Sequence, residues 1–144
     1  MKKIFFLFII FVSSIFAENI DLNKLVNEAK KSHKHILIFL HISGCSHCVK
    51  MEEFTFDDPK VEQMIKKHFL FVDINVKDDG NVSLLTFKGN KINFAKHIGY
   101  DMYPSSVFLD ENATVVFDEI GYKDEIKYLK TLQLVSNKSY NDID

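Results

Sequence analysis

The sequence predicts an α/β fold in which a central mixed β-sheet is flanked by helices. Apolar runs of strand length alternate with segments whose apolar residues recur at helical spacing. Near the C-terminus, two strand-like runs are separated by only four residues, which indicates an antiparallel hairpin beside otherwise parallel strands. A third observation is a Cys-x-x-Cys pair, Cys45 and Cys48, which opens a helix just after the first long strand.

The first half of the chain predicts a helix, a strand, two helices and a second strand. Asp21 is expected to cap the first helix. Residues 35–42 are almost continuously apolar, which is typical of a strand buried on both faces. Helices are expected over residues 46–56 and from 59 to about 68, and a strand over 69–76. The residues expected to face the core from the helix at 46–56 are Val49, Met51 and Phe54.

The second half predicts a small hairpin, a short helix, the antiparallel hairpin and a closing helix. The small hairpin lies within residues 82–92, and the short helix over 93–99 ends at a glycine that suits a helix C-cap. The antiparallel strands are expected at 106–109 and 114–118, and the last helix at 123–135. The apolar face of that helix is expected to consist of Ile126, Leu129, Leu132 and Val135.

The two ends of the chain predict one domain, residues 18–136, between a signal peptide and a polar tail. Residues 1–17 combine a lysine-containing start, an apolar run and a small residue, Ala17, at the expected cleavage position, which is the pattern of a secretory signal peptide. Signal-peptide cleavage after Ala17 would favour a small residue two positions before it, where this chain has the larger Ile15. An uncleaved segment that anchors the protein in the membrane is therefore an alternative. Residues 137–144 are polar and are expected to fray.

The composition argues against a nucleic-acid partner. The chain has 144 residues and a formal net charge of −2, and its 18 basic residues are all lysines. Arginine supplies the planar, two-pronged group that reads bases and grips phosphates, so its absence from the sequence removes the usual means of recognition.

Cys45 and Cys48 are the only cysteines in the sequence, so they form a closed pair with no thiol left over. A thiol at the start of a helix has a lowered pKa, because free N–H groups and the helix dipole stabilise its thiolate. Cys45 is therefore expected to be the nucleophile, and Cys48, one turn further on, the resolving thiol. His47, between the two, can stabilise the thiolate further, which would make the disulfide more oxidising.

Three other roles for the pair are weaker. A structural disulfide over so short a loop removes little entropy from the unfolded chain. A zinc site needs about four ligands, and the nearest additional candidates are His41 and His47. Covalent haem attachment needs a histidine directly after the second cysteine, where this chain has Val49. No metal and no cofactor are therefore expected.

The chain resembles the thioredoxin-fold superfamily, in particular its exported bacterial thioredoxin-like members. The segments that carry the resemblance are residues 36–42, 45–48, 69–76 and 103–110, followed by Gly121. The resemblance implies a thioredoxin-like fold with the Cys-x-x-Cys motif at a helix N-terminus. It also implies that Pro104 is cis and packs beside the cysteine pair, and that the backbone of Tyr103 pairs with an extended substrate strand.

Two positions depart from the family pattern. Gly44 stands where thioredoxins carry a tryptophan, and Phe39 stands where they carry a buried aspartate that helps deprotonate the resolving thiol. His41, Glu52, Glu53 or water must then take over that proton transfer. The remaining histidines, expected at the surface near element ends, are His33, His35, His68 and His97.

The segment 78–92 is an addition relative to a minimal thioredoxin, and it is either a partner-selecting element or a surface hairpin without a role. Asn81 and Asn112 each lie in an acidic-x-Asn-x-Ser/Thr pattern, the extended acceptor pattern of bacterial N-glycosylation, at a position where a turn is expected. Because Asp and Asn are also ordinary turn formers, glycosylation at these two sites stays a hypothesis.

The sequence favours an exported, periplasmic thiol–disulfide oxidoreductase that acts on cysteine-containing exported proteins. A membrane-bound or soluble redox partner would reset its cysteine pair. The resemblance favours a reductant, in an isomerase-type or cytochrome-maturation role, whereas His47 favours an oxidant. A non-catalytic binding module on the same scaffold is the remaining alternative.

Overall fold

A computed structural model describes residues 17–142, so the predicted signal peptide lies outside the described residues except for Ala17. The main sheet has four strands in the order β3-β2-β6-β7. They are β2 (His35–His41), β3 (Phe69–Asn75), β6 (Ser105–Leu109) and β7 (Val115–Ile120). β2 pairs parallel with β3 and antiparallel with β6, and β6 pairs antiparallel with β7. The mixed sheet expected from the sequence is confirmed.

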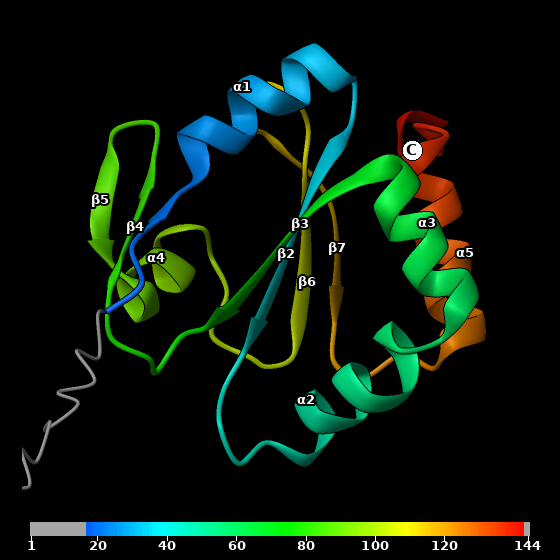
Figure 1. Cartoon of the computed structure of the whole chain (residues 1–144), viewed down its shortest axis with the longest axis horizontal. Helices are drawn as coiled ribbons and strands as arrows, with labels where there is room; N and C mark the ends of the chain where they lie inside the picture. The colour runs from blue at the N-terminus through cyan, green and yellow to red at the C-terminus, as the bar shows by residue number, and fades with distance from the viewer. Residues whose placement is uncertain (1–16, 143–144) are drawn as a thin grey trace, which may run out of the picture.

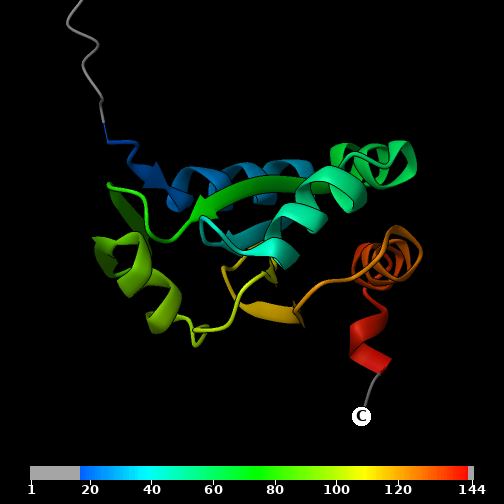
Figure 2. The same cartoon turned by 90° about the horizontal axis from the view of Figure 1, so that it is seen from below.

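β2 is an inner strand of the main sheet and contributes side chains to the cores on both of its faces. Each of its residues from His35 to Leu40 is buried, as its continuous apolar run predicts. Ile36, Ile38 and Leu40 belong to one core cluster, and Leu37 and Phe39 belong to another. Alternate side chains of one strand therefore fill two separate cores. Figures 1 and 2 show helices on both faces of this sheet.

The first face is covered by α1 (Leu22–Ser32) and α4 (Lys91–His97). Asp21 caps α1 by accepting the N–H of Asn23, as expected. Beside these helices lies a second sheet in the order β1-β4-β5. Its strands are β1 (Ile20–Asp21), β4 (Asn81–Leu84) and β5 (Phe87–Asn90). The hairpin expected within residues 82–92 is confirmed, whereas β1, which pairs parallel with β4, was not expected.

The second face is covered by the helices that follow the cysteine pair and by the C-terminal helix. They are α2 (Ser46–Lys50), the π-helix η1 (Met51–Phe56), α3 (Pro59–His68) and α5 (Glu125–Ser136). Asp58 caps α3, and its side chain accepts the N–H groups of Lys60 and Val61. α3 and α5 lie next to each other over this face, and α2, whose N-cap is Cys45, lies at one end of the layer.

Three residues expected in the core are exposed instead. Val49 is 41% exposed, Phe54 60% and Ile126 63%. The helix expected over 46–56 changes to a π-helix at Met51, and the wider turn brings Met51 and Thr55 inward in place of Phe54. In α5, the buried residues are Tyr128, Thr131, Leu132 and Val135, so the buried face is rotated away from Ile126.

The polar tail is ordered as far as the structure describes it. A 3₁₀-helix, η2 (Ser139–Asp142), follows α5, and the Tyr140 hydroxyl lies 2.9 Å from Nε2 of His35. His35 is only 5% exposed, so its expected surface position was wrong. The reason is long-range, because a residue more than 100 positions away in the sequence covers the start of β2.

Within residues 17–142, the structure contains no helix with the length and apolar character that crossing a bilayer requires.

Candidate functional site

The cysteine pair lies where the chain leaves the end of β2 and turns into α2. Gly44 makes this turn with a φ of 79°, in the left-handed region that glycine enters without strain. Cys45 and Cys48 form a disulfide with their Cα atoms 5.2 Å apart. Cys45 is the N-cap of α2, and its Sγ accepts the N–H of Cys48 at 3.1 Å. An N–H group of the first helical turn is therefore aimed at the sulfur of the first cysteine.

The two sulfurs differ in accessibility. Cys45 is partly exposed, whereas Cys48 is 1% exposed. A thiolate attacks a disulfide along the axis of the S–S bond and must reach the sulfur it attacks. An incoming thiolate can therefore approach Cys45 but not Cys48. This asymmetry matches the order of the two cysteines expected from the motif.

The loop before β6 lies against the exposed sulfur. The Tyr103–Pro104 peptide bond is cis, the conformation that the resemblance implies. The carbonyl oxygen of Tyr103 lies 4.0 Å from Sγ of Cys45. The Pro104 carbonyl accepts the N–H of Gly121 at 2.8 Å, which fixes this loop to the end of β7. Residues far apart in the sequence thus form one surface around Cys45.

His47 lies on the exposed side of α2, and its ring centroid is 6.3 Å from that of Tyr122. Tyr122 follows Gly121, so the ring of His47 is close to the same end of β7 that anchors Pro104. His41 is in a different environment, on the side of β2 that faces η1. The structure therefore does not bring His41 and His47 together as a pair of zinc ligands.

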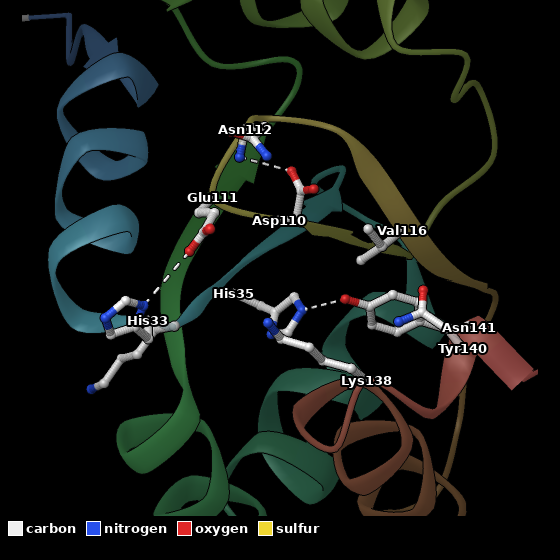
Figure 3. Close-up of a pocket in the computed structure, with 10 residues that line it drawn as sticks. His33, His35, Asp110, Glu111, Asn112, Val116, Lys138, Tyr140 and Asn141 are labelled. Atoms are coloured by element: carbon white, nitrogen blue, oxygen red, sulfur yellow. Dashed lines mark hydrogen bonds and ion pairs between the residues drawn. The ribbon is translucent and has the colours of Figure 1, made fainter.

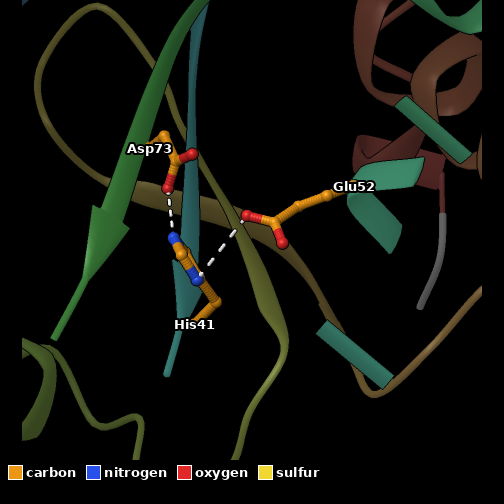
Figure 4. A group of neighbouring side chains, drawn as sticks. All are labelled: His41, Glu52 and Asp73. Carbon is orange, nitrogen blue, oxygen red and sulfur yellow. Dashed lines mark hydrogen bonds and ion pairs between the residues drawn. The ribbon is translucent and has the colours of Figure 1, made fainter. Parts of the chain in front are cut away.

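His41 lies between two carboxylates (Figure 4). Its Nε2 is 2.5 Å from Oδ1 of Asp73 on β3, and its Nδ1 is 3.8 Å from Oε1 of Glu52 on η1. Partial burial by itself lowers the pKa of His41, but the hydrogen bond and charge of Asp73, with the charges of Glu52 and Asp78, raise that pKa above its usual value. His41 is thus a packed, hydrogen-bonded residue, and two of the expected proton-transfer candidates, His41 and Glu52, lie side by side.

His41, Glu52 and Asp73 can each offer one ligand atom, and these atoms lie within 4.8 Å of one another. Such a set has the donor types of a divalent-cation site. However, the two carboxylates approach opposite nitrogens of the same ring. A cation on either nitrogen would meet only one carboxylate unless the side chains rearranged. The geometry fits an imidazole paired with two carboxylates better than a metal centre.

Sequence reasoning missed Asp73. In the parallel register, Asp73 is the partner of Phe39, two residues before His41. The side chains of Asp73 and His41 lie on the same side of the sheet, next to η1. The one available signal was a single acidic residue inside an apolar strand, and its meaning depends on the strand register, which the sequence alone does not fix.

A separate polar cavity of about 240 Å³ lies at the opposite end of β2 (Figure 3). His35 and Tyr140 meet there, and His33 lies 3.8 Å from a carboxylate oxygen of Glu111. Asn112 lies on the rim of the cavity and is exposed. Asn81, the other possible glycosylation acceptor, is exposed at the first position of β4 rather than in a turn.

Comparisons with known proteins agree with this geometry. The model of the thioredoxin-like domain matches residues 22–136. The chain belongs to the thioredoxin-like family. It is a thioredoxin-like oxidoreductase with a redox-active pair, Cys45 and Cys48. Proteins of this kind exchange disulfides with cysteine-containing proteins. A search of curated proteins gave no match.

Solved structures with the same fold share little sequence identity with this thioredoxin-like chain. A thioredoxin-fold protein from Helicobacter pylori matches with a TM-score of 0.66 at 20% identity, over 76% of this chain and 73% of its own. A putative disulphide isomerase from Bacteroides thetaiotaomicron gives 0.63 at 20%, over 83% and 91%. The reduced DsbD C-terminal domain from Neisseria meningitidis gives 0.58 at 17%, over 78% and 91%. These likenesses show the fold.

Proposed function

We propose that this thioredoxin-like protein is exported to the periplasm and exchanges disulfides with cysteines of other exported proteins, as a reductant or isomerase. The observation that carries the proposal is the partly exposed Sγ of Cys45, which accepts the N–H of Cys48 and lies 4.0 Å from the Tyr103 carbonyl. The signal-peptide pattern of residues 1–17 supports export.

In this mechanism the Cys45 thiolate attacks a substrate disulfide. An S–S bond forms between Cys45 and one substrate sulfur, and the other substrate sulfur leaves as a thiolate. Cys48 then loses its proton and attacks Cys45, which forms the Cys45–Cys48 disulfide and releases the second substrate thiolate. The Cys48 N–H stabilises negative charge on Cys45 in the first step and in its reverse. The backbone of Tyr103 and the adjacent Pro104 would hold an extended substrate segment beside the sulfur.

The direction of electron flow rests on the balance between two features. Similarity to a putative disulphide isomerase supports a reductant or isomerase, which a membrane or soluble partner would recharge with electrons. His47, exposed next to the sulfurs, supports the second candidate, an oxidant, because a cationic ring would stabilise the reduced thiolate. The reductant is favoured over the oxidant.

Reduction of insulin with dithiothreitol as electron donor tests the enzyme and the two cysteine roles together. The native chain is expected to accelerate insulin precipitation, and Cys45→Ser is expected to abolish the acceleration. Cys48→Ser is the matched control, because it keeps the attacking sulfur and is expected to trap insulin as a mixed disulfide on Cys45. Equal rates for the native chain and Cys45→Ser would leave the non-catalytic binding module as the better account.

Export and modification have their own readouts. Fractionation of cells that make the full chain is expected to recover it from the periplasm, and N-terminal sequencing distinguishes cleavage after Ala17 from a retained anchor.

If Asn81 and Asn112 carry glycans, the intact mass of the native protein exceeds the sequence mass, and Asn81→Gln with Asn112→Gln removes the excess. An unmodified mass in a glycosylating host would exclude both sites.

A further inference from the structure

The burial of Cys48 makes it difficult to remove the proton from its thiol. In the function proposed above, on which this inference rests, the Cys48 thiol must lose its proton before it can attack the mixed disulfide on Cys45. Cys48 is 1% exposed, so bulk water has little access to that proton. Burial also disfavours the charged thiolate relative to the thiol. A nearby group that accepts the proton would remove this obstacle.

Glu52 is placed to be that group. It lies four residues after Cys48 on the continuous helical segment formed by α2 and η1. Glu52 is the second residue of η1, about one helical turn after Cys48, and each Cα–Cβ bond of a helix tilts toward the helix N-terminus. From this position the Glu52 side chain can reach back toward the turn that holds Cys48. Its side chain is 38% exposed, so a proton taken from Cys48 can pass on to solvent.

His41 holds Glu52 on that side of the helix. The His41 ring stacks on Phe39, with ring centroids 5.1 Å apart and an interplanar angle of 15°. Its Nε2 is tied to Asp73 at 2.5 Å, which leaves Nδ1 directed at Glu52 (Figure 4). The side chain of His41 is 12% exposed, so its ring has little room to turn. A charged imidazole in this position attracts the Glu52 carboxylate and limits the directions in which it can point.

The surroundings of His41 favour its charged form. The carboxylates of Asp73 on β3 and Glu52 on η1 face the ring, and Asp78 adds a further negative charge. A cavity of about 290 Å³ on the Asp73 side is lined by His41, Asp73 and Asp78, by Glu18 and Asn75, and by one cation, Lys91. Acidic groups thus outnumber the lysine around the imidazole.

We propose that Glu52 is the proton acceptor for Cys48, and that His41, fixed by Asp73 and by stacking on Phe39, is the residue that positions Glu52. In the resolving step, the Cys48 S–H proton moves to the Glu52 carboxylate. The electron pair left on Cys48 forms the bond to Cys45, and the Cys45–substrate bond breaks with its electron pair on the substrate sulfur. In the reverse reaction, protonated Glu52 returns the proton to the departing Cys48 thiolate.

The two steps can be watched separately with an aromatic disulfide. Reduced protein is mixed with one equivalent of 5,5′-dithiobis(2-nitrobenzoate) in a stopped-flow instrument. Attack by Cys45 releases a first coloured thiolate in a phase that depends on concentration. Attack by Cys48 on the mixed disulfide releases a second thiolate in a phase that does not. The second phase reports on the resolving step, which includes proton removal from Cys48.

Glu52→Gln is expected to slow the second phase about a hundredfold at pH 7, the lower end of the range that general bases contribute, and to leave the first phase nearly unchanged. In this variant the second-phase rate should also rise in proportion to hydroxide concentration, because water and hydroxide become the acceptors. His41→Gln keeps a donor near Asp73 but carries no charge, and a slowing of about threefold is expected. That effect should shrink as pH rises and His41 of the native chain loses its charge.

Two further variants make the test selective. Glu62→Gln, which removes an exposed carboxylate on α3, is the charge-matched control and should leave both phases unchanged. Glu53→Gln tests the neighbouring carboxylate, and a slow second phase in this variant instead of in Glu52→Gln would overturn the proposal. An unchanged second phase in both Glu52→Gln and His41→Gln would also overturn it. Absence of a fast first phase in the native chain would refute the proposed function instead.

Discussion

At the scale of single residues, His41 and His35 respond to their surroundings in opposite ways. His41 has carboxylates at both ring nitrogens, and they raise its pKa although burial opposes the shift. His35 is buried at the start of β2 beneath Tyr140, and burial, with the charge of Lys138, lowers its pKa. The same side chain is thus stabilised as a cation at one end of β2 and as a neutral ring at the other.

This contrast predicts opposite pH dependences of stability. For His41, the folded pKa lies above the unfolded value, so its contribution is fully present below about pH 6.5 and is lost as pH rises through the folded pKa. His41→Gln is therefore expected to lower the free energy of unfolding by about 1 kcal/mol near pH 5.5 and by less at pH 9. Urea denaturation of the native chain and the variant at each pH measures this difference.

His35→Gln is the matched comparison in that series. The unfolded state binds a proton on His35 more readily than the folded state, so the native residue costs stability as pH falls below about 6.5. The stability of His35→Gln relative to the native chain should therefore improve toward acid pH, the opposite slope. Parallel curves for the two variants would contradict the assignment of these two environments.

His47 predicts a change in redox potential. A histidine cation near the sulfurs stabilises the reduced thiolate, and its removal should make the disulfide harder to reduce. His47→Leu is expected to lower the reduction potential by about 30 mV, equivalent to about a tenfold change in the equilibrium constant with a dithiol. Equilibration with dithiothreitol or glutathione mixtures, followed by thiol alkylation, measures the potential. A higher potential in His47→Leu would show that the imidazole does not act through charge on the thiolate.

At the scale of elements, the sequence predicted the strands and caps well and the buried helix faces less well. Asp21 caps α1 as expected, because capping is decided within a few neighbouring residues. The predicted burial of Phe54 was wrong because it assumed α-helical spacing, whereas the π-helix η1 has more residues per turn. The predicted burial of Ile126 was wrong because the buried face of α5 depends on how α3 and η1 pack against that helix. Local signals were sufficient only where the cause is local.

Thr55 is one of two η1 side chains that hydrogen-bond to Lys123 in the loop before α5; the other is Met51, whose sulfur accepts the Lys123 N–H. Thr55 is fully buried, and its hydroxyl donates to the Lys123 carbonyl at 2.7 Å. Thr55→Val keeps the shape but leaves that carbonyl without its donor, so a loss of about 1–2 kcal/mol of stability is expected. Thr55→Ser, which keeps the hydroxyl, should lose less of the hydrogen-bond contribution. Chemical denaturation of the three proteins measures the difference, and an equal loss in both variants would assign the effect to packing instead.

At the scale of the whole molecule, the candidate site combines short-range and long-range features. Cys45, Cys48 and the turn at Gly44 are neighbours in sequence, and the motif alone located them. The pairing of Asp73 with His41 and the cover that Tyr140 places over His35 depend on which strands and helices meet across the fold. β1 was missed for a similar reason, since a two-residue strand carries no periodic pattern and exists only through its pairing with β4.

The direction of electron flow is also a property of the whole molecule. Oxidation and unfolding form a thermodynamic cycle. The difference in unfolding free energy between the oxidised and reduced proteins therefore equals the difference in redox free energy between the folded and unfolded cysteine pairs. A strong oxidant is a protein whose reduced form is the more stable one. A reductant is the reverse, because its fold favours the disulfide over the dithiol.

The favoured reductant role therefore predicts that the oxidised protein resists urea better than the reduced protein. Each difference of about 1.4 kcal/mol in unfolding free energy should correspond to about 30 mV between the potentials of the folded and unfolded pairs. Unfolding of both forms, with the Cys45→Ser/Cys48→Ser variant as a redox-inert control, measures that difference independently of any substrate. A more stable reduced form would reverse the direction proposed here, and the charge of His47 next to the thiolate would then be the dominant influence on the pair.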